Sequence, residues 1–124
     1  MLMRLNYVIV YISDMQRSIA FYRDQLGFPV KTESPGWTEF HTGAITLALH
    51  HGQPAERLRG AHGEERAGQA QFSIEVADIE KFYEEKKAKG VEFIMPPTMR
   101  PFGAKLTIFR DPDGLAISVT EEVR

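Results

Sequence analysis

The chain has 124 residues, of which 43% are hydrophobic, and that is enough apolar material for one folded domain. Its formal net charge is −2 with no basic run, so we expect no binding to nucleic acid. It has no cysteine, which excludes disulfides, thiolate metal sites and a cysteine nucleophile. No apolar stretch approaches the roughly 20 residues of a membrane helix, and no signal-peptide pattern opens the chain. We expect a cytoplasmic protein that does not bind membranes.

The first predicted elements are a strand and a helix. NYVIVYISDM (6–15) contains an apolar strand that ends in an aspartate. After this strand in the sequence, four apolar residues recur with the 3.6-residue period of a helix: Met15, Ile19, Tyr22 and Leu26. Ser13 or Asp14 can cap the start of this helix, and Gly27 is suited to its end.

Three strands are predicted next, at about 29–34, 37–42 and 44–50, separated by turns that contain glycine. The segment 52–69 is charged and rich in glycine, without an apolar period. It is predicted to be a linker.

The second half repeats the first. AQFSIEVADI (70–79) matches residues 6–15, and a helix then runs from Asp78 towards Gly90. Strands follow at about 91–95, 104–110 and 115–120. The sequence therefore predicts an α+β fold with two βαβββ modules, 1–51 and 70–124, in a single domain of residues 1–124. Because neither module can bury its own sheet, the two must share a core or find a partner chain.

Two segments carry a resemblance to a known family. YVIVYISDMQRSIAFYRDQLGF and FRDPDGLAISV resemble the first module and the last strand pair of the vicinal oxygen chelate superfamily. This superfamily includes glyoxalase I, bleomycin-resistance proteins and extradiol dioxygenases. The resemblance implies an open, cup-like, eight-stranded mixed sheet around a small-molecule site, with the helices outside. It also implies a homodimer.

In the metal-dependent members, four repeat-related positions carry the ligands. They correspond here to Tyr7, Ala48, Gln71 and Ser118. Only Gln71 is an acceptable donor for a divalent ion, and Ala48 has no donor atom. The resemblance therefore implies a member without the usual metal and without a cofactor.

Strand alternation assigns the side chains that would line the cup. The helix-facing sides of the two first strands are apolar, and the opposite sides are aromatic or polar. The residues predicted to face the cup are Tyr7, Tyr11, Gln71, Ser73 and Glu75. Tyr11 and Glu75 can instead lie at a dimer contact.

Further candidates lie near strand ends and loops. His50 shares the face of Ala48 and is either an acid/base group at the rim or an exposed histidine at a strand end. A rim metal site formed by His41 and His50 is a further hypothesis. Trp37 and Phe102 can stack on a planar ligand and Arg100 can hold a carboxylate, or these residues only cover the edge of the core.

Three functions are compatible with these features. The first is a protein that binds a small organic or aromatic ligand without a metal, resembling the bleomycin-resistance type. The alternative is a lyase, isomerase or dioxygenase resembling glyoxalase I, whose ion is held by a non-standard set that includes Gln71 and His50. The third is an interaction module with a cup that is filled by side chains.

Overall fold

The computed structural model describes residues 5–52, 70–101 and 103–122. The chain divides into two compact units, Met1–Glu56 and Arg57–Arg124. The predicted linker lies outside the described residues from residue 53 to residue 69, and so does Phe102. The single domain with this linker stays a prediction.

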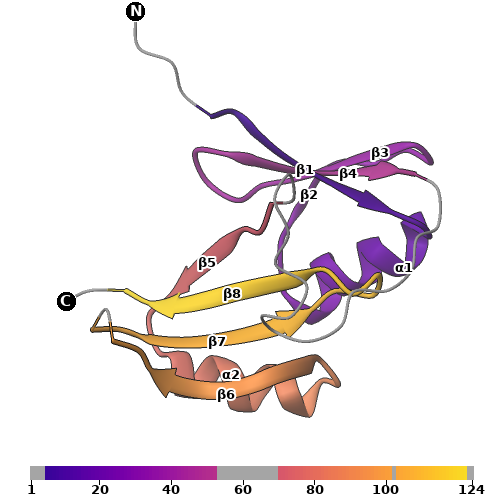
Figure 1. The fold of residues 1–124 in the computed structure, drawn as a ribbon. Coiled ribbons are helices and arrows are strands. Elements are labelled where there is room, and N and C mark those ends of the chain that lie inside the picture. Colours follow the sequence, from indigo (N-terminus) through magenta and orange to yellow (C-terminus); the bar gives the residue numbers. More distant parts are fainter. Residues whose placement is uncertain (1–4, 53–69, 102, 123–124) are drawn as a thin grey trace, which may run out of the picture. The chain divides into compact units, whose positions relative to one another are not determined.

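The first unit is a β-α-β-β-β module. Its strands form one mixed sheet in the order β1-β4-β3-β2, in which β1 and β4 are parallel. The helical segment lies along one face of this sheet (Figure 1). The elements are β1 (Tyr7–Ile12), α1 (Met15–Ile19), η1 (Ala20–Gln25), β2 (Val30–Thr32), β3 (Trp37–Phe40) and β4 (Thr46–His51).

The core of the first unit lies between the sheet and the helix. β1 and β4 supply Val10, Ile12, Leu47 and Leu49, which are all buried. From the helical segment, Met15, Ile19 and Tyr22 are buried as the 3.6-residue period predicts. On the opposite face of the sheet, Tyr7, Ile9 and Tyr11 of β1 are exposed.

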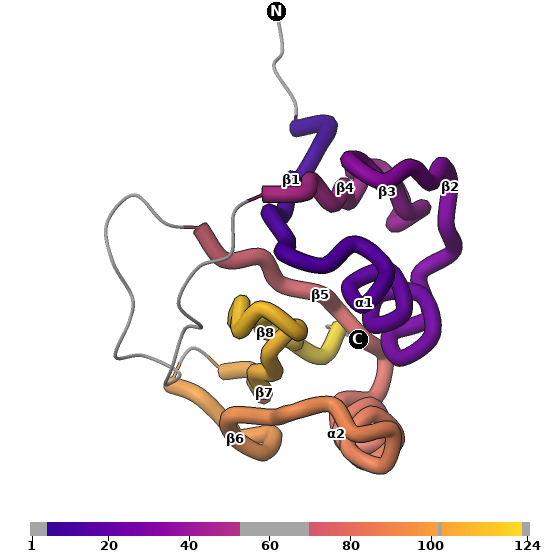
Figure 2. Tube along the Cα trace, turned by 90° about the vertical axis from the view of Figure 1, so that its right-hand side faces the viewer, coloured from indigo at the N-terminus to yellow at the C-terminus, as the bar shows by residue number. Residues whose placement is uncertain are grey.

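The second unit has the same order of elements. Its sheet follows the order β5-β8-β7-β6, with β5 parallel to β8, and α2 covers one face (Figures 1 and 2). The elements are β5 (Ser73–Val76), α2 (Ile79–Ala88), β6 (Glu92–Met99), β7 (Lys105–Arg110) and β8 (Ala116–Glu121). The α+β class and the two βαβββ modules are thus confirmed, with the eight strands in two four-stranded mixed sheets.

Both the helix caps and the strand register reproduce the internal repeat. Asp14 accepts a hydrogen bond from the backbone N of Arg17 at 3.1 Å, and Asp78 accepts one from Lys81 at 3.0 Å. Of the two capping candidates in the first module, Asp14 is therefore the cap. The parallel pairs Ile9–Ala48 and Ser73–Ser118 are equivalent in the repeat. The sequence alignment of the two halves therefore matches the strand pairing inside each unit.

The first helix departs from the prediction. Regular α-helix ends at Ile19, and Ala20–Gln25 form a π-helical turn. Within it the backbone N of Leu26 donates to the carbonyl of Phe21 at 3.0 Å. The wider turn allows the consecutive rings of Phe21 and Tyr22 to be buried together, with their centroids 5.1 Å apart. A strict 3.6-residue period cannot place neighbouring residues on one narrow stripe.

Strand β6 is longer than the sequence predicts. β6 was predicted to end at residue 95 but continues to Met99, through Pro96 and Pro97. Two prolines are tolerated because β6 is the outermost strand of its sheet, and the pairing with β7 is irregular between Met95 and Thr98.

Candidate functional site

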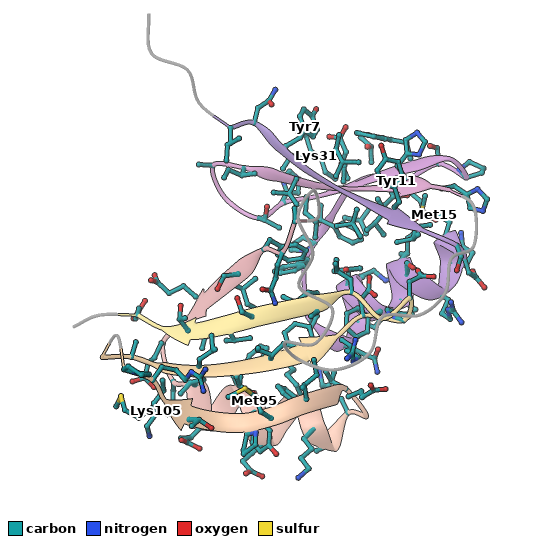
Figure 3. All side chains as sticks on the ribbon, in the orientation of Figure 1. Tyr7, Tyr11, Met15, Lys31, Met95 and Lys105 are labelled. Carbon is teal, nitrogen blue, oxygen red and sulfur yellow. The ribbon has the colours of Figure 1, made fainter. Side chains whose placement is uncertain are left out.

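The face of the first sheet that lies opposite the helix carries most of the candidate residues. Tyr7, Ile9 and Tyr11 of β1 alternate with the core residues, so they share this face. Strand pairing adds Thr46, Ala48 and His50 from β4, and Trp37 and Glu39 from β3. Figure 3 shows Tyr7 and Lys31 on this side of the sheet and Met15 on the helix side.

Four rings on this face contact one another, and we call them the aromatic face: Tyr7, Tyr11, Trp37 and His50. His50 lies between Tyr11 and Trp37, with ring centroids 5.4 Å and 5.7 Å apart, both edge to face. The rings of Tyr7 and Trp37 are 6.1 Å apart. The structure therefore brings together four predicted ligand-binding residues from three strands.

Ala48 lies beneath this contact. Strand β4 runs between β1 and β3. Tyr7 on β1 pairs with Thr46 of β4, and Trp37 on β3 pairs with His50 of β4, so Ala48 lies on β4 midway between these two pairs. Because the two rings nevertheless come within 6.1 Å of each other, they lean together above Ala48. Ala48 is accordingly 0% exposed. We therefore expect a longer side chain at position 48 to meet these rings.

Glu39 is a residue of this face that the sequence reasoning missed. It is paired with Ala48 across the strands, and its Oε2 accepts a hydrogen bond from Trp37 Nε1 at 2.8 Å. Its Oε1 lies 3.8 Å from Nζ of Lys31 on β2. The alternation of W-T-E-F, which puts Glu39 on the face of Trp37, was the available signal.

His50 is exposed and faces the site, as predicted. Its Nδ1 lies 3.0 Å from the carbonyl oxygen of His51. Since a carbonyl can only accept, Nδ1 is the donor of this hydrogen bond. His51 lies on the other face, where its Nε2 is 3.2 Å from the carbonyl oxygen of Ser13.

The hypothesis of a rim metal site formed by His41 and His50 is wrong. β3 and β4 are antiparallel, with Trp37 opposite His50 and Phe40 opposite Leu47. His41 follows Phe40, so it lies at the other end of the strand pair. Among residues 5–52, 70–101 and 103–122, no three His, Asp or Glu side chains are grouped as a metal would require.

The second unit presents a polar face opposite α2. Ser73 pairs with Ser118, and Glu75 pairs with Thr120, so these side chains share one side of the sheet. Gln71 precedes β5 and is exposed. Arg100 lies apart from them in the β6–β7 turn, where its carbonyl accepts from Gly103 N at 2.9 Å. Ser73, Glu75, Ser118 and Thr120 therefore form a polar strip along β5 and β8, and Leu106 and Ile108 of β7 lie beside it on the same face.

The residues at the four ligand positions of the metal-dependent relatives do not fit a divalent ion. Ala48 offers no donor and is covered by rings, and Tyr7 is engaged with Trp37. Ser118 and Gln71 offer only neutral oxygens, and the described residues contain no group of three His, Asp or Glu side chains that could complete a site.

A comparison with known proteins identifies the superfamily of this chain. The family model described as "Glyoxalase/Bleomycin resistance protein/Dioxygenase superfamily" matches residues 4–119. The chain belongs to this superfamily. No helix in the described part of the chain is long and apolar enough to cross a membrane.

Relatives within the superfamily are distant. An uncharacterized Bacillus subtilis protein, YraH, is 27% identical, over 94% of this chain and 97% of its own length. The metallothiol transferase FosB of Staphylococcus saprophyticus is 28% identical, over 92% of this chain and 74% of its own. The crystal structure of SMU.1112c has a TM-score of 0.84 at 26% identity, covering 98% of this chain and 100% of that one. These identities show a shared superfamily, and they do not identify the ligand of this chain.

Proposed function

We propose that this chain binds a small organic ligand with an aromatic group, without a metal ion. The observation that carries the proposal is the contact of Tyr7 and Trp37 above Ala48. At two of the positions that carry metal ligands in metal-dependent members, this chain has the aromatic Tyr7 and the small Ala48.

The exposed parts of the aromatic face supply the binding surface. Tyr11 is 70% exposed and Tyr7 is 38% exposed, so both rings can cover a planar ligand. Stacked or edge-to-face ring contacts contribute about 0.5–1.5 kcal/mol each beyond the area that they bury. Phenol and imidazole groups add hydrogen bonds that orient the ligand. The polar residues Gln71, Ser73, Glu75 and Ser118 and the loop residues Arg100 and Phe102 remain proposed ligand contacts.

The fluorescence of Trp37 provides a direct test, because it is the one tryptophan of the chain. A panel of benzyl and naphthyl compounds is titrated while the emission of Trp37 is recorded. We expect saturable quenching, together with a rise in melting temperature, since a ligand of the folded state stabilises it. Tyr11→Ala should weaken binding about 5- to 10-fold through the loss of one ring contact.

Met99→Ala is the matched control, because Met99 is a large apolar residue that is 61% exposed in the second unit. It should leave the dissociation constant unchanged. Absence of both quenching and thermal stabilisation across the panel would contradict the proposal. That result would favour the interaction module as the function.

The alternative is a metal-dependent lyase, isomerase or dioxygenase with a non-standard ligand set that includes Gln71 and His50. The relative named metallothiol transferase FosB is the observation that favours it. Elemental analysis of protein purified without chelators tests it. A stoichiometric Ni, Zn, Fe or Mn ion that is lost in His50→Ala would support this alternative and refute metal-free binding.

A homodimer in the cytoplasm is part of the proposal. Ile9, exposed on the edge strand β1, and the exposed Leu5 that precedes this strand provide apolar surface for a second copy. Light scattering at several protein concentrations measures the assembly, and a monomer at all of them would contradict this part.

A further inference from the structure

We propose that the aromatic face selects an organic cation, a ligand that carries a quaternary or alkyl ammonium group beside its aromatic part. The proposal rests on the proposed function, because the same face binds the ligand. It adds the sign of the ligand's charge, which the shape of the face alone does not decide.

The first support is the carboxylate of Glu39. Its side chain is only 16% exposed, and it lies next to Ala48 in the middle of the face. Trp37 Nε1 donates to one of its oxygens at 2.8 Å and so holds it in place. A mostly buried carboxylate is costly unless a positive charge approaches it.

The positive charge nearest to Glu39, that of Lys31, is held only loosely. Nζ of Lys31 is 3.8 Å from Oε1, which is long for an ion pair, and the side chain of Lys31 is 45% exposed. Because the distance is long and the lysine is half exposed, this pair contributes little to stability. The flexible lysine can move into solvent, and the ammonium group of a ligand can take its place beside Glu39.

The rings around Glu39 favour the same sign of charge. The π-faces of tyrosine and tryptophan attract cations, and recognition of quaternary ammonium groups commonly uses such rings together. The rings of Tyr7 and Trp37 are 6.1 Å apart, and Trp37 is bonded to Glu39 itself. An anion would meet a carboxylate and three π-faces, with Lys31 as the one described cation of this cluster.

Three probes with one benzyl group separate charge from shape: benzyltrimethylammonium, benzyl alcohol and phenylmethanesulfonate. Each is titrated against the full chain, with Trp37 emission as the readout. We expect the cation to bind at least about tenfold more tightly than the alcohol, and the anion to bind most weakly.

Two variants test the role of Glu39. Glu39→Gln keeps the size of the side chain and an oxygen that can accept from Trp37, so the indole should stay in place. It should weaken the cation about tenfold and leave the alcohol unchanged. Lys31→Met removes the competing ammonium and should tighten the cation about 2- to 5-fold. This second variant keeps the test decisive if Glu39→Gln does not fold.

The outcomes distinguish the two proposals. If none of the probes changes Trp37 emission, the proposed function fails and this inference fails with it. If the alcohol or the anion binds as tightly as the cation, only the preference for a cation is refuted. If Glu39→Gln weakens all three probes equally, Glu39 merely positions Trp37, and the inference is again refuted.

Discussion

Replacing Ala48 by glutamate tests whether the aromatic face has taken the place of a metal site. Ala48 is 0% exposed, and the rings of Tyr7 and Trp37 lean together above it with centroids 6.1 Å apart. A glutamate there must displace a ring or bury its own charge. Overpacking and an unpaired buried charge together predict a loss of roughly 2–4 kcal/mol in the free energy of unfolding.

Thermal unfolding followed by circular dichroism measures this loss. For a chain of this size, roughly 3–4 °C per kcal/mol gives a fall in melting temperature of about 10 °C. Ala48→Gln has nearly the same size without the charge, so the difference between the two variants isolates the cost of burying a carboxylate. Ala48→Ser should change stability by less than about 1 kcal/mol, because the added hydroxyl is small.

The reasoning would be refuted by a glutamate variant that keeps its melting temperature. It would be refuted more strongly if that variant also bound one divalent ion and became more stable, as a restored ligand set requires. Either result would mean that the space above Ala48 is available to a longer side chain.

Two further predictions concern the helix ends and use denaturant midpoints as the measurement. Gly90 has φ +89°, so Gly90→Ala should cost about 1–2 kcal/mol, whereas Gly36→Ala, with an unstrained φ and open space, should be nearly neutral. Equal losses at the two glycines would contradict this. Asp14→Ala and Asp78→Ala should each cost about 1 kcal/mol, because each aspartate accepts from a first-turn N–H. A cap that can be removed without loss would show that water replaces it.

Much of the fold follows from local patterns in the sequence. Alternation along β1 separates Tyr7 and Tyr11 from the core, and the repeat makes Ala48 equivalent to Ser118. Two aspartates mark the helix starts because a side chain that accepts from the first turn acts over three residues. Such features depend on near neighbours in the chain, so they can be read without a structure.

The departures come from contacts between distant segments. The π-turn at Ala20–Gln25 buries Phe21 together with Tyr22, whose ring lies 5.9 Å from that of Phe40 on β3, and the helical period does not predict this. β6 continues through Pro96 and Pro97 because one side of this edge strand is unpaired and its pairing with β7 is irregular between Met95 and Thr98.

The sequence by itself determined the repeat and the two βαβββ modules. Together with the family resemblance, it also determined that Gln71 is the one acceptable donor at the four ligand positions. Only the tertiary structure decided that Glu39 lies beside Ala48, that Tyr7 and Trp37 meet above it, and that His41 is remote from His50. The physical reason is strand register. Periodicity assigns a side chain to a face, whereas the hydrogen-bonded pairing of strands chooses its neighbours on that face.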